Sequence, residues 1–182
     1  MEGIEIVDMF NKKDNELVRL NVGCGHQNLP GYINLDLVHD TADIKADFFD
    51  YGKTCGEIYD EVLVSHFLEH VAIARIQTCL ATILMCLKPG GVINAVVPDF
   101  DYIADCWVRY KEDWKKIELN QFVFGGQTNA GDFHVSAWNN TILAKELIDA
   151  GFENVWTALS WDHNQRTVIG GGYKPKKEDQ DG

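Results

Sequence analysis

The sequence lacks the long apolar segments that membrane proteins need. None of its uninterrupted apolar runs approaches the roughly 18 residues of a membrane-spanning helix. Residues 1–10 are acidic and lack the basic start and apolar centre of a secretory signal peptide. We therefore expect a protein that stays out of the membrane and is located in the cytoplasm.

Basic residues are also scarce. The chain has 16 Lys and Arg against 28 Asp and Glu, which gives a formal net charge of −12. Nucleic acids and anionic lipid surfaces are bound mainly through clustered positive charge. The basic residues here are scattered, apart from Lys174, Lys176 and Lys177. The composition therefore argues against a membrane or a nucleic acid as the general partner.

The five cysteines form no metal or redox motif of the C-x-x-C type. Cys79 and Cys86 lie in an apolar segment of helical periodicity, so we expect them to be buried thiols. With 46% apolar and 24% charged residues, the chain has the composition of an ordinary globular protein. Its 182 residues are expected to form one domain, 1–182, that folds without a disulfide or a structural metal.

Apolar, β-branched segments alternate with segments of helical periodicity. The expected strands are 17–22, 32–37, 44–47, 59–64, 92–97, 155–161 and 166–169. The expected helices are 72–87, a segment from Asp99 or Asp101 to about Ile117, and 141–150 capped by Asn140; a loop is expected over 120–137. The polar segments 11–16 and 174–182 are expected to be flexible.

This alternation predicts an α/β fold. It indicates an open, mostly parallel sheet with helices on both faces, which closes on an antiparallel hairpin. Only six residues separate Gly25 from Tyr32, which is too few for the usual helical crossover between parallel strands. We therefore expect a shortened first crossover made of an irregular turn.

The carboxyl ends of the expected strands mark a ligand site, because ligands bind at that edge of such sheets. The strand ends are Gly23-Cys24-Gly25, Asp36, Asp47-Phe48 and Ser65-His66. Glycines allow a ligand close to the backbone, and a carboxylate after the second strand suits the two hydroxyls of a ribose. Together these ends predict a nucleoside-shaped pocket. The alternative is that the glycines only turn the chain and the acids are solvated.

A dinucleotide is a poorer ligand for this pocket. Dinucleotide sites use G-x-G-x-x-G at the start of a helix, and the third glycine position is Asn28 here. The neighbouring segments are acidic, which disfavours a pyrophosphate. These points favour a ligand without phosphates, and an oxidoreductase with a nucleotide cofactor is the rival interpretation.

Five segments carry a resemblance to a known family. They are Leu20-Asn21-Val22-Gly23-Cys24-Gly25, Asn34-Leu35-Asp36, Ala46-Asp47-Phe48, Ser65-His66-Phe67-Leu68-Glu69-His70 and Leu87-Lys88-Pro89-Gly90-Gly91. In this order, over residues 17–99, they resemble the class I S-adenosylmethionine-dependent methyltransferases of the small type with a Gly-Cys-Gly first loop. The sequence departs from the family at Asn21, where an acid is common, and in the missing first helix.

The resemblance implies a Rossmann-like fold with a seven-stranded sheet whose last strand is antiparallel. It implies S-adenosyl-L-methionine as the cofactor and residues 17–99 as the cofactor-binding half. Within that half it implies that Asp36 binds the ribose and that Asp47 lies near the adenine. The full set of expected cofactor-binding residues is Asn21, Gly23, Cys24, Gly25, Asp36, Leu37, Asp47, Phe48, Ser65 and His66.

Methyl transfer needs alignment and in some enzymes a base that faces the pocket. We expect His66 and His134 as the catalytic residues and no metal, with Glu69 and His70 bracing a helix start. The alternative is that His66, Glu69 and His70 bind a divalent cation, with His134 as a fourth ligand. The small-RNA 2′-O-methyltransferases and ubiquinone O-methyltransferases of the family use Glu-x-x-Glu-His in this way, and His66 replaces the first Glu here. The H-x-x-E-H spacing also matches an inverted zinc-protease motif, which the surrounding segments oppose.

Segment 100–140 is expected to bind the acceptor and to act as a lid. It is rich in aromatic residues, and Gly125, Gly126 and Gly131 are candidate hinges. The chain has no additional recognition domain, which favours a small-molecule or sugar-containing acceptor. The predicted function is methyl transfer from S-adenosylmethionine to such an acceptor. The alternative is a catalytically inactive cofactor-binding or scaffold module with the same fold.

Overall fold

The computed structural model describes residues 17–129, 131–162 and 165–177. Its strands are β1 (Arg19–Val22), β2 (Ile33–Asp36), β3 (Ile44–Lys45), β4 (Tyr59–Ser65), β5 (Leu87–Pro98), β6 (Glu153–Asp162) and β7 (Gln165–Tyr173). Its helices are α1 (Phe48–Gly52), α2 (Ile76–Cys86), α3 (Phe100–Arg109), α4 (Asp113–Phe124) and α5 (Asn140–Asp149), with two 3₁₀ helices, η2 (Leu68–His70) and η3 (Ile73–Arg75). The expectations for 1–16, for 178–182 and for the turn at His163 and Asn164 lie outside the described residues. Across the described segments, no helix has the length and apolar character to cross a membrane.

The seven strands form one sheet in the order β3-β2-β1-β4-β5-β7-β6. Strands β1 to β5 are parallel, while β7 runs antiparallel to both of its neighbours. This topology confirms the predicted sheet and its closing hairpin. Within the described chain no helix joins β1 to β2, as the short first crossover predicts. Lys174, where the sequence predicts the flexible tail to begin, is bonded to β5, because its amide donates to the Gly91 carbonyl at 2.8 Å.

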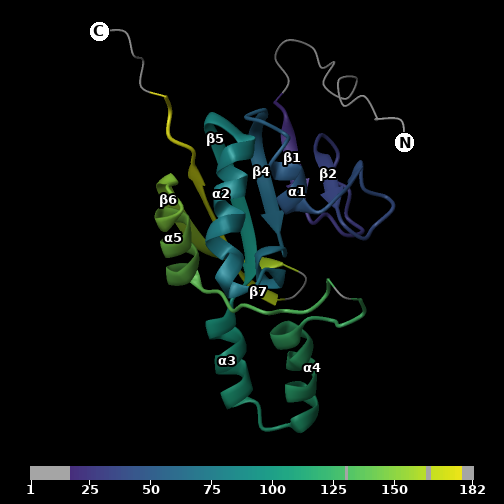
Figure 1. Cartoon of the computed structure of the whole chain (residues 1–182). Coiled ribbons are helices and arrows are strands. Elements are labelled where there is room, and N and C mark those ends of the chain that lie inside the picture. The colour runs from purple at the N-terminus through teal and green to yellow at the C-terminus, as the bar shows by residue number, and fades with distance from the viewer. Residues whose placement is uncertain (1–16, 130, 163–164, 178–182) are drawn as a thin grey trace.

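Helices α1, α2 and α5 pack together on one face of the sheet (Figure 1). Burial alternates along β5, where Ile93 is fully buried and its two neighbours are partly exposed. Such strand residues meet Ile83 of α2 and Leu143 of α5 in one apolar core. Cys79 and Cys86 are completely buried in this core, as the sequence predicts.

The opposite face of the sheet carries polar side chains beside apolar ones such as Leu63 and Val96, and none of the described helices covers it (Figure 1). Asn21 on β1 donates to Asn34 on β2 at 3.0 Å, and Asn94 on β5 donates to Glu61 on β4 at 2.8 Å. Tyr32 also donates to Glu61, at 2.9 Å. The expected helices on this second face are missing because the connections after β1 and β2 are too short to hold them. The polar side chains of this face satisfy one another instead.

Helices α3 and α4 extend beyond the carboxyl end of β5 as a pair (Figure 1). The sequence predicts one helix to about residue 117 and a loop from residue 120. The structure instead breaks the helix at Tyr110, where the backbone is extended (φ −67°, ψ 128°), and continues α4 to Phe124. Asp99 occupies the position before α3 but makes no capping bond. The apolar spacing of three to four residues runs through the break, so periodicity did not reveal it.

Helix α5 begins one residue earlier than the sequence predicts. Asn139 is its cap, because Asn139 Oδ1 accepts the Ile142 amide at 2.8 Å, and Asn140 is the first helical residue. Two adjacent asparagines are chemically equivalent caps. The extended backbone of Asn139 (φ −145°, ψ 178°) decides between them.

The capping assignment predicts different effects for the two asparagines. Asn139→Ala should lower the free energy of unfolding by about 1 kcal/mol, because the Ile142 amide loses its acceptor. Asn140→Ala is the matched control and should change it by less than about 0.5 kcal/mol. Urea denaturation followed by circular dichroism measures both. A larger loss in Asn140→Ala than in Asn139→Ala would show that the cap is assigned wrongly.

Candidate functional site

A cleft of about 650 Å³ lies at the carboxyl edge of the parallel strands. Its walls come from the loops after β1, β2, β3 and β4 and from the loop that follows α4. The expected cofactor-binding residues that line this cleft are Gly23, Gly25, Asp36, Leu37, Asp47, Phe48 and His66. The predicted strand ends therefore converge on one cleft.

The two glycines of the first loop serve different purposes. Gly23 has φ +67°, and a Cβ there would lie 2.5 Å from Cδ2 of Phe67, so the loop passes directly against that ring. Gly25 has φ +55°, and an added Cβ would meet no described heavy atom within 4 Å. Gly23 therefore permits the tight turn, while Gly25 leaves its backbone open to a ligand.

Asp36 ties the end of β2 to the glycine loop. Its Oδ2 accepts the Gly25 amide at 2.9 Å, and its Oδ1 accepts the amides of Val38 and His39 at 2.8 and 3.0 Å. Burial opposes ionisation of this carboxyl, but the backbone N–H groups outweigh it and lower the pKa of Asp36 below 3.8. Asp36 is therefore a fixed anion, and the remaining lone pair of its Oδ2 can accept a hydrogen bond from a ligand.

Asp47 and the aromatic residues after it form one wall of the cleft. Asp47 Oδ1 caps α1 by accepting the Phe49 amide at 2.7 Å. Phe48 is 4% exposed, and its ring meets Phe67 edge-on with 6.1 Å between centroids. The Arg75 guanidinium lies 3.8 Å from the centroid of Phe49. Phe67 and Arg75 also line the cleft, and the strand-end pattern did not identify them.

Three residues predicted to bind the cofactor do not line the cleft. Asn21 is buried and donates to Asn34 at 3.0 Å. Cys24 is 6% exposed, and its Sγ lies 3.6 Å from Oδ1 of Asn28. Ser65 is the last residue of β4. The side chains of Asn21 and Cys24 therefore support the first loop instead of facing the cleft.

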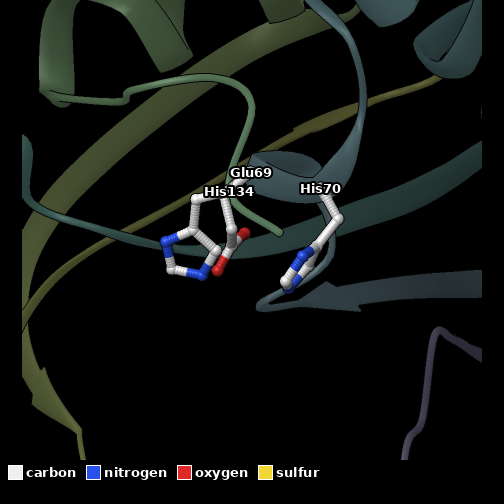
Figure 2. Close-up of side chains that lie close together, drawn as sticks. All are labelled: Glu69, His70 and His134. Carbon is white, nitrogen blue, oxygen red and sulfur yellow. The ribbon is translucent and has the colours of Figure 1, made fainter. Parts of the chain in front are cut away.

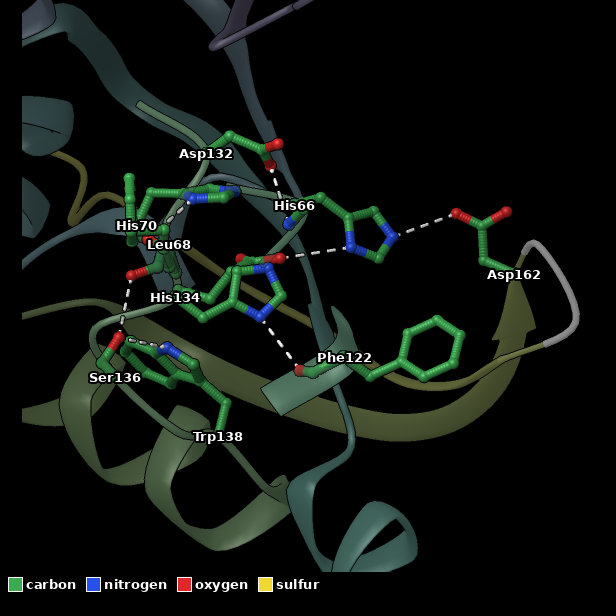
Figure 3. A network of polar contacts seen from close by, with 12 residues as sticks. His66, Leu68, His70, Phe122, Asp132, His134, Ser136, Trp138 and Asp162 are labelled. Atoms are coloured by element: carbon green, nitrogen blue, oxygen red, sulfur yellow. Dashed lines mark hydrogen bonds and ion pairs between the residues drawn. The ribbon is translucent and has the colours of Figure 1, made fainter. Parts of the chain in front are cut away.

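His66 lies between two carboxylates (Figure 3). Its Nδ1 is 3.2 Å from Glu69 Oε1, and its Nε2 is 3.2 Å from Asp162 Oδ2. Burial favours the neutral ring, but the bonds to Glu69 and Asp162 outweigh it and raise the pKa of His66 above 6.5. Both ring nitrogens therefore face carboxylate oxygens, which favours the protonated ring. This arrangement differs from the free base that the sequence predicts at His66.

Glu69, His70 and His134 form a compact cluster (Figure 2). One ligand atom of each residue lies within 4.8 Å of those of the other two. His134 follows α4 and is distant in sequence from η2, which holds Glu69 and His70. The Glu69 carbonyl accepts the amides of Val135 and Ser136 at 2.8 and 3.2 Å. This main-chain pairing brings His134 to the cluster.

Main-chain carbonyls orient both imidazole rings of the cluster. His70 Nδ1 donates to the Phe133 carbonyl at 3.1 Å, and His134 Nδ1 donates to the Phe122 carbonyl at 3.0 Å. In a neutral ring, Nε2 then carries the lone pair. Burial lowers the pKa of His134 below 6.5, which favours its neutral form. Glu69 is 1% exposed, and its Oε2 has no hydrogen-bond partner among the described residues. The cluster can therefore hold a divalent cation or accept protons from a ligand.

A second cavity, of about 320 Å³, also reaches this cluster. It is bounded by the start of α3, the end of α4 and residues 134–138. Glu69 and His134 line the second cavity, His70 lines the cleft, and Val135 lines both. The cluster therefore lies where the two cavities meet.

Comparison with known proteins gives matches in structure alone. No protein-family model and no curated protein matches the sequence. An S-adenosylmethionine-dependent methyltransferase from Archaeoglobus fulgidus matches with a TM-score of 0.61 and 15% identity, over 87% of this chain and 86% of its own. One from Methanosarcina mazei matches with a TM-score of 0.61 and 12% identity, over 97% of this chain and 100% of its own.

A third match is an enzyme with a named substrate. The 1,6-didemethyltoxoflavin-N1-methyltransferase of Burkholderia thailandensis was solved with 1,6-didemethyltoxoflavin and S-adenosylhomocysteine bound. It matches with a TM-score of 0.59 and 15% identity, over 89% of this chain and 72% of its own. Together with the strand order described above, these likenesses show that the chain has the Rossmann-like fold of the class I S-adenosylmethionine-dependent methyltransferases.

Proposed function

We propose that this protein transfers a methyl group from S-adenosylmethionine to a small-molecule acceptor. The observation that carries the proposal is the cleft, in which the open backbone of Gly25, the fixed carboxylate of Asp36 and the apolar wall at Phe48 face one space. The cleft adjoins a cluster of proton-accepting side chains. The fold likeness to S-adenosylmethionine-dependent methyltransferases supports the same function.

The residues of the cleft fit this cofactor. Asp36 is held as an anion by three backbone amides, and its Oδ2 is suited to accept from one ribose hydroxyl. The open space beside Gly25 admits a ligand against the backbone. Phe48 supplies an apolar surface for the adenine ring. Asp47 caps α1 through Oδ1, which leaves Oδ2 for the adenine amino group.

The protein has three tasks in this reaction: alignment, exclusion of water and removal of a proton from the acceptor. When bound, the cofactor supplies a methyl group on a sulfonium centre with a thioether leaving group. His134 serves as the base in this proposal, because its neutral form carries a lone pair on Nε2 where the two cavities meet. His66 serves as a positioning residue, since it holds one oxygen of Glu69.

Asp36→Ala should weaken the binding of S-adenosylhomocysteine by about 1–3 kcal/mol, because a ribose hydroxyl loses its acceptor and the Gly25 loop loses its anchor. Isothermal titration calorimetry on the purified protein measures the affinity. Asp40→Ala is the matched control, since it removes an exposed carboxylate from the same loop, and should leave the affinity unchanged. Equal affinities of the wild type and a folded Asp36→Ala variant would mean that the ribose lies elsewhere.

An inactive cofactor-binding module is the alternative to an enzyme. The missing helix after β1 supports it, because that helix normally completes the first loop of such folds. Methyl-labelled S-adenosylmethionine distinguishes the two functions. A labelled product from an acceptor excludes the inactive module, whereas firm cofactor binding without any product excludes the enzyme.

Methyl transfer assisted by a divalent cation is a second candidate function, and the Glu69–His70–His134 cluster favours it. Both rings donate from Nδ1 to main-chain carbonyls, which is the outer-shell arrangement that orients metal-binding histidines. Glu69 Oε2, which lacks a partner in the described chain, supplies the anionic ligand. These three side chains would hold the cation, and it would polarise the hydroxyl of the acceptor.

Manganese provides the test of this second candidate. The wild-type protein should bind Mn²⁺, and Glu69→Ala should weaken that binding by a factor on the order of 10–100. Electron paramagnetic resonance of free Mn²⁺ measures the bound fraction. Glu153→Gln changes an exposed carboxylate on β6 and should leave binding unchanged. Wild-type protein that does not bind Mn²⁺ would eliminate this candidate and leave His134 as a base.

A further inference from the structure

The second cavity exposes apolar side chains that a folded protein normally covers. Phe100 and Phe124 are 38% and 53% exposed, and Val135 is 49% exposed. Ile103 and Trp138 also line the cavity and are each 2% exposed. Aromatic side chains gathered in this way around a cavity indicate a binding surface for an apolar ligand.

Two polar side chains of the lining, Trp138 and Ser136, are satisfied within the protein (Figure 3). Trp138 Nε1 donates to Ser136 Oγ at 3.0 Å, and Ser136 Oγ donates to the Leu68 carbonyl at 3.1 Å. Two other residues of the lining keep an acceptor for a ligand. His134 has the lone pair on Nε2, and Glu69 has Oε2, which is buried and has no partner in the described part of the chain. A buried acceptor without a donor is costly, so this oxygen indicates a donor on the ligand.

The size and polarity of the cavity limit the ligand further. A volume of about 320 Å³ lies at the lower end of the range for small-molecule sites, which suits one or two rings. A sugar would bring a hydroxyl on nearly every carbon, and the apolar walls offer these hydroxyls no partners. Of the two acceptor classes that the sequence leaves open, the cavity therefore disfavours the sugar.

We propose that the acceptor is a small aromatic alcohol or amine, whose rings occupy the second cavity and whose hydroxyl or amino group donates to Glu69. This inference rests on the proposed function and names its substrate class. It places the attacked oxygen or nitrogen where the cavity meets the cofactor cleft, beside His134 and Val135. A cation held by the cluster would bind the same atom, so the assignment is the same for both candidate functions.

Calorimetric titration of protein saturated with S-adenosylhomocysteine tests the inference with three probes. They are 2-naphthol, naphthalene and glucose, each in EDTA and again with Mn²⁺. We expect 2-naphthol to bind about tenfold more tightly than naphthalene, because it alone has a donor for Glu69. We expect no binding of glucose. In Glu69→Leu, which removes the acceptor and keeps most of the side-chain volume, the preference for 2-naphthol over naphthalene should disappear.

Two matched variants test whether the rings of the ligand bind in the second cavity. Phe124→Ser removes an exposed wall of the cavity and should weaken both naphthalene and 2-naphthol by about fivefold or more. Ile117→Ser removes an exposed apolar side chain from the same helix outside the cavity and should change neither. Both side chains are already exposed, so neither substitution opens a hole in the core.

The outcomes separate this inference from the proposed function. Protein that binds S-adenosylhomocysteine but not 2-naphthol, with or without Mn²⁺, overturns the substrate class and leaves the methyltransferase proposal standing. Protein that fails to bind S-adenosylhomocysteine overturns the methyltransferase proposal itself. Tighter binding of glucose than of 2-naphthol overturns the assignment. If the protein forms a dimer that Phe124→Ser dissociates, and 2-naphthol does not bind, the substrate class is overturned. The cavity is then the surface that contacts a second copy of the chain.

Discussion

The site depends on the pairing of one main-chain carbonyl with two amides. The carbonyl of Glu69, in the short turn after β4, accepts from Val135 and Ser136 in the segment that follows α4. This pairing joins two parts of the chain that are far apart in sequence. It places His134 beside Glu69 and His70, and it makes Val135 a wall of both cavities. Without it, the cofactor cleft and the second cavity would not meet at one group of side chains.

The rest of the fold keeps this edge of the sheet rigid with few helices. Only one face of the sheet is covered by described helices, and the polar side chains of the other face bond to each other. The loop after β1 has no helix to hold it, so Asp36 anchors it through the Gly25 amide. A carboxylate that fixes its own loop in this way is already oriented before a ligand binds, which reduces the entropy lost on binding.

The parts of the structure that follow from local patterns could be predicted from the sequence. Alternating apolar segments predicted the mostly parallel sheet and the closing hairpin but not the strand order, and the strand-end rule identified Gly25, Asp36 and Phe48 as neighbours in space. Sequence could not distinguish Asn139 from Asn140 as a cap, because the backbone angles decide. The sequence also predicted a single helix through Tyr110, because the apolar spacing continues across the break between α3 and α4.

Contacts between distant segments account for the remaining differences. His66 has the residue type of a base, but Asp162 of the far hairpin supplies a second carboxylate that helps to raise the pKa of its ring. Phe67 and Arg75 line the cleft through tertiary packing, which no strand-end rule anticipates. His134 is an ordinary loop residue until the Glu69 carbonyl binds the adjacent amides. These contacts carry the chemistry of the site, so sequence patterns predicted its location better than its mechanism.

A crystal structure of the protein soaked with S-adenosylhomocysteine tests the central claim most directly. The account predicts a ribose hydroxyl within hydrogen-bond distance of the Asp36 carboxylate, the adenine against Phe48, and the sulfur directed toward the Glu69–His70–His134 cluster. A ligand bound outside this cleft, or a ribose that does not contact Asp36 in a fully occupied complex, would contradict the account.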